Sequence, residues 1–149
     1  MTVRAVLAVG LALSICGVAL PVMADATATR ADAAGAREAD TAADAVTRLI
    51  DSDAVAGPGA RETVTVALPE GPGTGVAALA VGDVPGTGSK PAVAYRVEGA
   101  GWRVVTRLPA TVCASECGDP LVVRADARLT LRLDREGGER VVRATARPL

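Results

Sequence analysis

The spacing of apolar positions changes once along the chain, near residue 60. Before that point, the stretch 36–51 has apolar residues at helical spacing: Ala42, Ala45, Val46, Leu49 and Ile50. A Gly-Pro-Gly run comes next, at 57–59, and such a run ends a helix. The pattern predicts one short helix at about 36–51, which either docks on the domain C-terminal to it or tethers that domain.

From residue 61 to 149, apolar and polar residues alternate with a period of two, and turn residues recur at short intervals. This pattern is typical of short strands that each bury one face. It predicts seven or eight strands and a mainly β fold, namely a small antiparallel β-sandwich or a barrel-like domain.

Two hairpins follow from the turn residues. Gly99 and Ala100 predict a tight turn between strands 93–98 and 102–108, with Tyr95 opposite Val104 and Arg96 opposite Arg103.

A second hairpin turns at 135–138, with Asp134 opposite Glu139. Four residues then share an apolar face: Leu129, Leu131, Val142 and Ala144. The opposite face carries Thr130, Arg132, Arg143 and Thr145.

Residues 1–24 have the layout of a secretory signal peptide. Arg4 precedes a stretch without charge from 5 to 24, and small residues allow cleavage after Ala24 or Ala26. The alternative is an uncleaved membrane anchor, since 20 uncharged residues are long enough to cross a bilayer. We expect a secreted or envelope-associated protein, with no membrane span once the peptide is removed. Arginine greatly outnumbers lysine, which suggests a bacterial genome rich in GC.

Composition divides the rest into an Ala/Asp-rich segment, 25–60, and the β domain, 61–149. The first segment is acidic and has few large apolar side chains, so we expect it to be mobile outside its short helix.

Cys113 and Cys117 are the two cysteines that remain after removal of the signal peptide, which holds Cys16. In an oxidising compartment such a pair forms a disulfide. We place it at the tip of a hairpin between 108–113 and 117–123.

Several kinds of chemistry are disfavoured by composition. The chain has no histidine, the usual general base and zinc ligand, and its serines therefore have no histidine to activate them. One Trp and one Tyr are too few to stack nucleic-acid bases. The sequence predicts no enzyme, no metal, no cofactor and no nucleic-acid partner.

Arginines recur on polar positions of the predicted strands, which suggests a surface that binds anions. The candidates are Arg96, Arg103, Arg107, Arg128, Arg132 and Arg143. An anionic envelope polymer or a secreted protein would fit such a surface. The alternative is an ordinary solvated sheet face, on which long arginine stems cover apolar area.

The predicted disulfide stiffens a second candidate, the loop of Ala114, Ser115 and Glu116. A rigid exposed loop loses little entropy on docking, as in many protease inhibitors. We therefore predict a secreted bacterial protein with a non-catalytic binding or envelope-associated role, and a secreted protease or enzyme inhibitor as the alternative.

Overall fold

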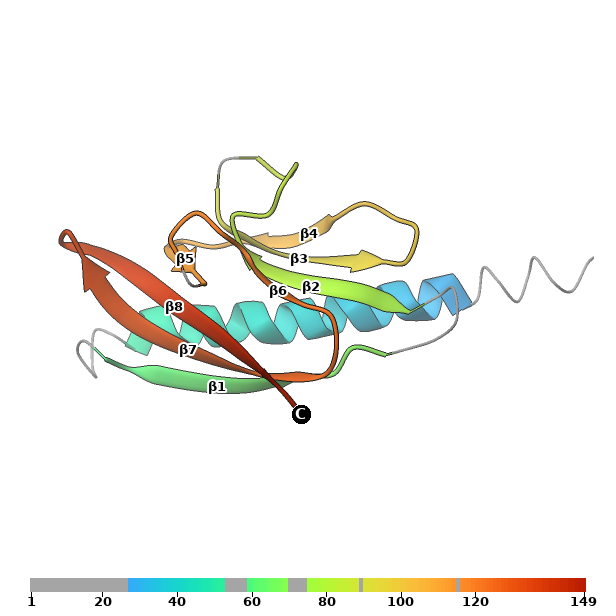
Figure 1. The fold of residues 1–149 in the computed structure, drawn as a ribbon, viewed down its shortest axis with the longest axis horizontal. Coiled ribbons are helices and arrows are strands. Elements are labelled where there is room, and N and C mark those ends of the chain that lie inside the picture. Colours follow the sequence, from blue (N-terminus) through green and yellow to red (C-terminus); the bar gives the residue numbers. More distant parts are fainter. Residues whose placement is uncertain (1–26, 53–58, 70–74, 89, 115) are drawn as a thin grey trace, which may run out of the picture.

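A computed structural model describes residues 27–52, 59–69, 75–88, 90–114 and 116–149. They form one helix, at 27–52, and eight strands in two sheets, so the fold is mainly β as predicted. Figure 1 shows the helix passing behind both sheets. The predicted signal peptide lies outside the described residues.

Sheet A has the strand order β1-β7-β8-β5, and sheet B has the order β4-β3-β2-β6. The strands of sheet A are β1 (Arg61–Val66), β7 (Ala127–Glu136), β8 (Glu139–Pro148) and β5 (Thr111–Cys113). Those of sheet B are β4 (Arg103–Arg107), β3 (Ala92–Val97), β2 (Val76–Gly82) and β6 (Leu121–Val123). All pairings are antiparallel except that of β5 with β8, which is parallel.

The predicted barrel is wrong, because both sheets are open. Their inner faces and the helix share one hydrophobic core. Leu129, Leu131 and Leu133 of β7 and Leu79 of β2 are almost fully buried in it, together with Leu49 of the helix. The helix is therefore a structural part of the β domain. A sandwich of two sheets alone would not include it.

The helix is longer than the predicted stretch 36–51 and is packed rather than mobile. Its buried stripe continues toward the N-terminus through Ala39, Gly35 and Ala31, each four residues apart. Alanine and glycine add little hydrophobic signal, which is why the sequence pattern did not reveal this part. Their small side chains let the helix approach the sheets closely.

The β7–β8 hairpin turns at Gly137 and Gly138, whose φ angles of 60° and 90° suit a two-residue turn. Glu136 therefore lies opposite Glu139, and Asp134 lies opposite Val141. The predicted pairing of Asp134 with Glu139 is wrong by two positions. Because the shift is even, every side chain keeps its face, and the predicted apolar and polar faces are confirmed.

Between the turn and a bulge, the predicted register of β3 and β4 is wrong by one position, whereas beyond the bulge Val93–Thr106 and Ala92–Arg107 have the predicted register. Tyr95 lies opposite Arg103 and Ala94 opposite Val104, and a bulge follows at Val93. Five residues, 98–102, separate β3 from β4, where a two-residue turn was expected. A one-residue shift moves Arg103 to the inner face, where it meets the helix.

The predicted hairpin between 108–113 and 117–123 does not form. β5 pairs with β8 in sheet A, whereas β6 pairs with β2 in sheet B. The disulfide therefore stiffens the crossover between the two sheets.

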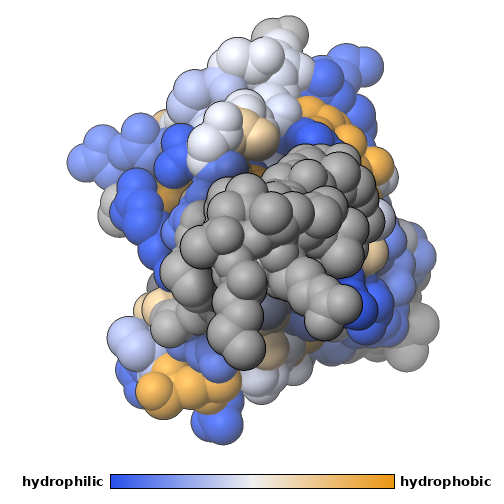
Figure 2. Space-filling view, turned by 90° about the vertical axis from the view of Figure 1, so that its right-hand side faces the viewer, coloured by the Kyte–Doolittle hydropathy of each residue, from blue (hydrophilic) through white to orange (hydrophobic). Residues whose placement is uncertain are grey.

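No helix among the described residues is long and apolar enough to cross a membrane. Figure 2, viewed toward the end where the described helix begins, shows a largely hydrophilic surface with small, separate hydrophobic areas.

Candidate anion-binding face

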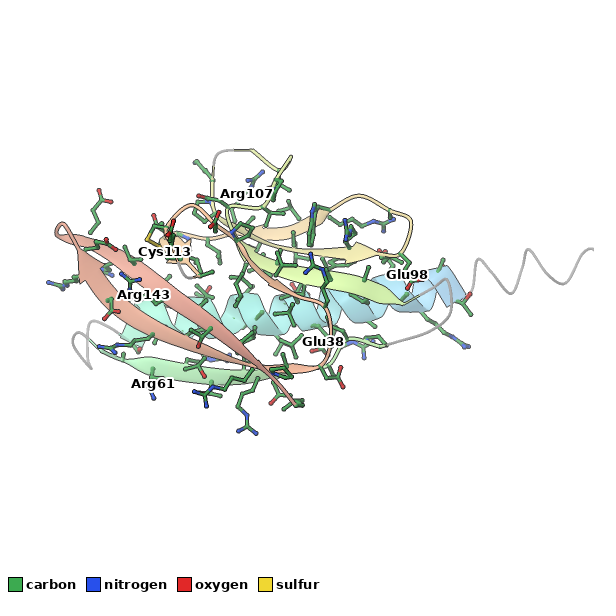
Figure 3. All side chains as sticks on the ribbon, viewed as in Figure 1. Glu38, Arg61, Glu98, Arg107, Cys113 and Arg143 are labelled. Atoms are coloured by element: carbon green, nitrogen blue, oxygen red, sulfur yellow. A yellow bond between two sulfur atoms is a disulfide. The ribbon has the colours of Figure 1, made fainter. Side chains whose placement is uncertain are left out.

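The structure separates the six predicted arginines into two groups. Arg128, Arg132 and Arg143 lie together on the outer face of sheet A. Arg96, Arg103 and Arg107 belong to sheet B. Figure 3 shows Arg107 near the top of the molecule, well away from Arg143 and Arg61 on sheet A.

Each arginine of the sheet B group has a partner within the chain. Arg103 forms an ion pair with Asp32 of the helix. Arg107 donates to the backbone oxygens of Lys90 and Thr87, and so holds the loop before β3. The guanidinium of Arg96 lies 5.2 Å from the centre of the Trp102 ring. We assign these three arginines to the fold rather than to a binding surface.

Asp32 also joins the helix to Tyr95, whose hydroxyl donates to its carboxylate at 2.7 Å. Burial raises the pKa of Tyr95, and the hydrogen bond to Asp32 raises it further, while Arg103 partly opposes both. The contacts of Asp32 with Tyr95 and Arg103 hold the N-terminal half of the helix against sheet B.

Two further arginines, Arg61 and Arg147, complete the surface on sheet A. Arg61 lies opposite Arg132 across β1 and β7, and Arg147 lies opposite Arg128 across β7 and β8. Threonines fill most of the remaining exposed positions on these strands. We name this surface the Arg/Thr face; it comprises Arg61, Thr63, Thr65, Arg128, Thr130, Arg132, Arg143, Thr145 and Arg147.

Sequence reasoning missed Arg61 because it did not reveal that β1 pairs with β7. It placed Arg147 at the end of the last predicted strand, but the shifted register did not reveal that Arg147 lies opposite Arg128. The alternation of Arg61, Thr63 and Thr65 with apolar Val64 and Val66 was the available signal.

One end of the Arg/Thr face is neutralised by acids. The Arg132 Nε lies 3.3 Å from a carboxylate oxygen of Asp134, and the Arg143 Nε lies 3.4 Å from the other. Arg143 also reaches Glu136, at 3.2 Å. These acids lie near the β7–β8 turn, so the group of Arg132, Arg143, Asp134 and Glu136 has no net formal charge.

The other end of the face has cations and no such acids. Arg128 and Arg147 lie directly opposite each other, a placement that destabilises a sheet unless an anion lies between them. Within the described parts of the chain, no hydrogen bond or ion pair engages the side chain of Arg61, Arg128 or Arg147. The acid next to them along the chain, Asp126, accepts the backbone N–H of Leu68 at 2.8 Å.

A surface hollow of about 560 Å³ extends from this end along the face to Arg61, which lies opposite Arg132. Arg61, Arg128 and Arg147 line it, together with Thr130 and Thr145. The hollow therefore combines three guanidinium groups with two hydroxyl groups. Such a set can bind carboxylate, sulfate or phosphate groups and can hydrogen-bond to neighbouring hydroxyls.

Comparison with known proteins gives one family. A family described as a domain of unknown function, DUF7311, matches residues 2–147. The chain belongs to the DUF7311 family. No curated protein and no solved structure matches it.

In this DUF7311 chain the second candidate site, the loop within the disulfide, is only partly described. Cys113 and Cys117 are bonded, with their Cα atoms 4.3 Å apart. Between them Ala114 is half-buried and Glu116 is exposed, while Ser115 lies outside the described residues. The Cys117 Sγ lies 3.7 Å from a carboxylate oxygen of Glu136, so the loop borders the neutralised end of the Arg/Thr face.

The acidic and sulfur-containing side chains of this DUF7311 chain do not gather into a metal centre over the residues that the structure describes. There, no three His, Cys, Asp or Glu side chains lie close enough together to hold a metal ion.

Proposed function

We propose that this protein is exported and acts, without catalysis, by binding an anionic polymer of the cell envelope through the Arg/Thr face. The layout of residues 1–24 supports export. The opposition of Arg128 and Arg147 carries the binding part of the proposal. Two like charges with no acid between them weaken the sheet, and a bound anion would relieve that cost.

Charge distribution across the face also supports the proposal. A face that served solubility alone would not need its acids gathered at one end. Here the acids Asp134 and Glu136 lie at the turn end, beside Arg132 and Arg143, whereas Arg128 and Arg147 lie at the other end. Arg61, opposite Arg132, lines the same hollow as Arg128 and Arg147. An extended polyanion could follow the strands and lie over the guanidinium groups of Arg61, Arg128 and Arg147, which have no ion-pair partner among the residues that the structure describes.

The test is binding of the purified full-length protein to dextran sulfate beads, with plain dextran beads as a control. We expect retention on the sulfated beads at low salt and release at high salt, because exposed charges are screened over about 8–10 Å. The variant R61A/R128A/R147A should weaken binding by about tenfold or more, since each lost ion pair is worth up to about 1 kcal/mol.

The matched control is R30A/R37A/R124A, which removes the same charge from exposed positions outside the Arg/Thr face. It should retain most of the binding. Equal losses in both triple variants, or binding that does not respond to salt, would contradict the proposal. A partner captured from culture fluid and lost only after reduction of the disulfide would favour the inhibitor alternative.

A further inference from the structure

We propose that the polymer is a linear acidic polysaccharide in which an uncharged sugar separates the charged ones. This inference rests on the proposed function and names the ligand class of the same face. It depends on how arginine and threonine are ordered along sheet A.

The Arg/Thr face consists of three rows that cross β1, β7 and β8. The first row holds Arg61, Arg132 and Arg143, and the second holds Thr63, Thr130 and Thr145. The third holds Thr65, Arg128 and Arg147. The two arginine rows are four residues apart along each strand, and a row of hydroxyl groups lies midway between them.

A strand rises about 3.3 Å per residue, so the two arginine rows are separated by about 13 Å. An anionic group held by Arg128 and Arg147 and another held by Arg61 would have this separation, adjusted by the reach of the side chains. The threonine row between them offers hydroxyl groups. That of Thr145 donates to the Thr130 backbone oxygen at 3.5 Å and can still accept a hydrogen bond, and a threonine hydroxyl can otherwise both donate and accept. Hydroxyls of an uncharged sugar would match that row, and carboxylates would match the arginines on either side.

The order of the rows disfavours polymers with a charge on every unit. A polyphosphate lying along the strands would place phosphates over Thr130 and Thr145, where there is no cation. Toward the turn it would also meet the carboxylates of Asp134 and Glu136.

Nucleic acid lacks its usual stacking platform here. The single Trp lies in the loop before β4 and packs against sheet B, and the single Tyr is buried beneath the helix.

The experiment compares three polymers at equal charge concentration with the purified full-length protein. The first is hyaluronan, which has one carboxylate in each disaccharide. The second is polygalacturonate, which has a carboxylate on every sugar, and the third is polyphosphate. Calorimetry at low salt should rank hyaluronan as the tightest ligand and polyphosphate as the weakest.

Variants separate the contribution of the hydroxyls from that of the charges. T130V/T145V keeps the shape and β propensity of the strands but removes two hydroxyl groups. It should weaken hyaluronan binding by about tenfold, because two hydrogen bonds are lost, and should change polyphosphate binding by less than about twofold. R128T/R147T should weaken the binding of all three polymers.

Two results would overturn the inference: tighter binding of polyphosphate than of hyaluronan, or unchanged hyaluronan binding in T130V/T145V. Either would leave the Arg/Thr face as a general anion-binding surface, and the proposed function would stand. Failure of all three polymers and of dextran sulfate to bind would remove both proposals.

Discussion

Gly35 of the helix lies directly against the ring of Tyr95 on β3. A Cβ atom at position 35 would lie 2.5 Å from the ring Cδ2, closer than a van der Waals contact allows. The ring cannot move aside easily, because it is buried and its hydroxyl is bonded to Asp32, one helical turn earlier. The contact between Gly35 and the Tyr95 ring sets the distance between the helix and sheet B.

Replacement of Gly35 by alanine should therefore destabilise the protein. Inside a helix this change alone would stabilise by up to about 1 kcal/mol. We expect the clash with Tyr95 to reverse the sign and lower the free energy of unfolding by about 1–2 kcal/mol. Urea unfolding measures this. The control A33G, at an exposed position of the same helix, should cost about 1 kcal/mol through propensity alone. A more stable G35A protein would show that the helix is not held against the ring.

The raised pKa of Tyr95 predicts a loss of stability in alkali. Its folded-state pKa lies above the unfolded value of about 10, chiefly because of burial and then because of the bond to Asp32. Folding therefore holds the phenol proton more tightly. This contribution is complete below about pH 10 and is lost as the pH rises through the folded pKa.

Because the chain has a single tyrosine, phenolate absorbance reports this residue alone. The folded protein should titrate at a higher pH than the urea-unfolded protein. In Y95F, the alkaline slope of the free energy of unfolding should be shallower than in the parent. Equal titration midpoints for the folded and unfolded chains would contradict the assignment.

The alternation of residues predicted faces well and strand partners poorly. For β7 and β8 the inward and outward positions are as predicted, although the pairing shifts by two, because a period of two is insensitive to an even shift. Near the turn the β3–β4 pairing failed because a longer loop changed the register by one, and a bulge restores the predicted register beyond it. Strands β5 and β6 were assigned to each other because they are neighbours in sequence, yet their partners, β8 and β2, lie elsewhere in the chain.

For the candidate site too, the sequence predicted which residues share a face within a hairpin but not which distant strands lie side by side. Arg128, Arg132 and Arg143 were placed on one face by alternation within a hairpin. Arg61 joins them only through the pairing of β1 with β7, more than sixty residues later in the chain, which no local pattern encodes. Arg103 was misplaced because a shift of one residue turns its side chain toward Asp32. Local periodicity thus identifies half of a surface, and long-range pairing completes it.

The opposition of Arg128 and Arg147 predicts that removing one of them stabilises the protein when no ligand is present. R147T should raise the free energy of unfolding by about 0.2–1 kcal/mol at low salt, since it relieves a cross-strand repulsion. The gain should shrink at high salt, where the charges are already screened. Thermal unfolding at two salt concentrations measures both effects.

R143T is the matched control, because Arg143 lies on the same face of the same strand but contacts Asp134 and Glu136. Its removal should give no gain, and a loss of at most about 1 kcal/mol, since these exposed pairs are weak. If R143T and R147T stabilise equally, the two ends of the Arg/Thr face do not differ in charge balance.

We expect reduction of the disulfide to lower the stability of the protein without changing its binding to dextran sulfate. It closes a loop of sequence separation 4, and chain-entropy arithmetic for so short a loop gives about 2 kcal/mol. Reduction should lower the free energy of unfolding by about that amount. Retention on dextran sulfate should persist, because Cys117 borders Glu136 at the neutralised end, and Arg147 lies four residues beyond Arg143 along β8.

Urea unfolding and bead retention, each with and without reductant, measure the two properties. In C113A/C117A the reductant should have no effect on either, which controls for reactions elsewhere in the protein. Loss of retention in a reduced chain that remains folded would place the binding surface at the disulfide loop instead of the Arg/Thr face. In that case, inhibition of secreted proteases becomes the activity to assay.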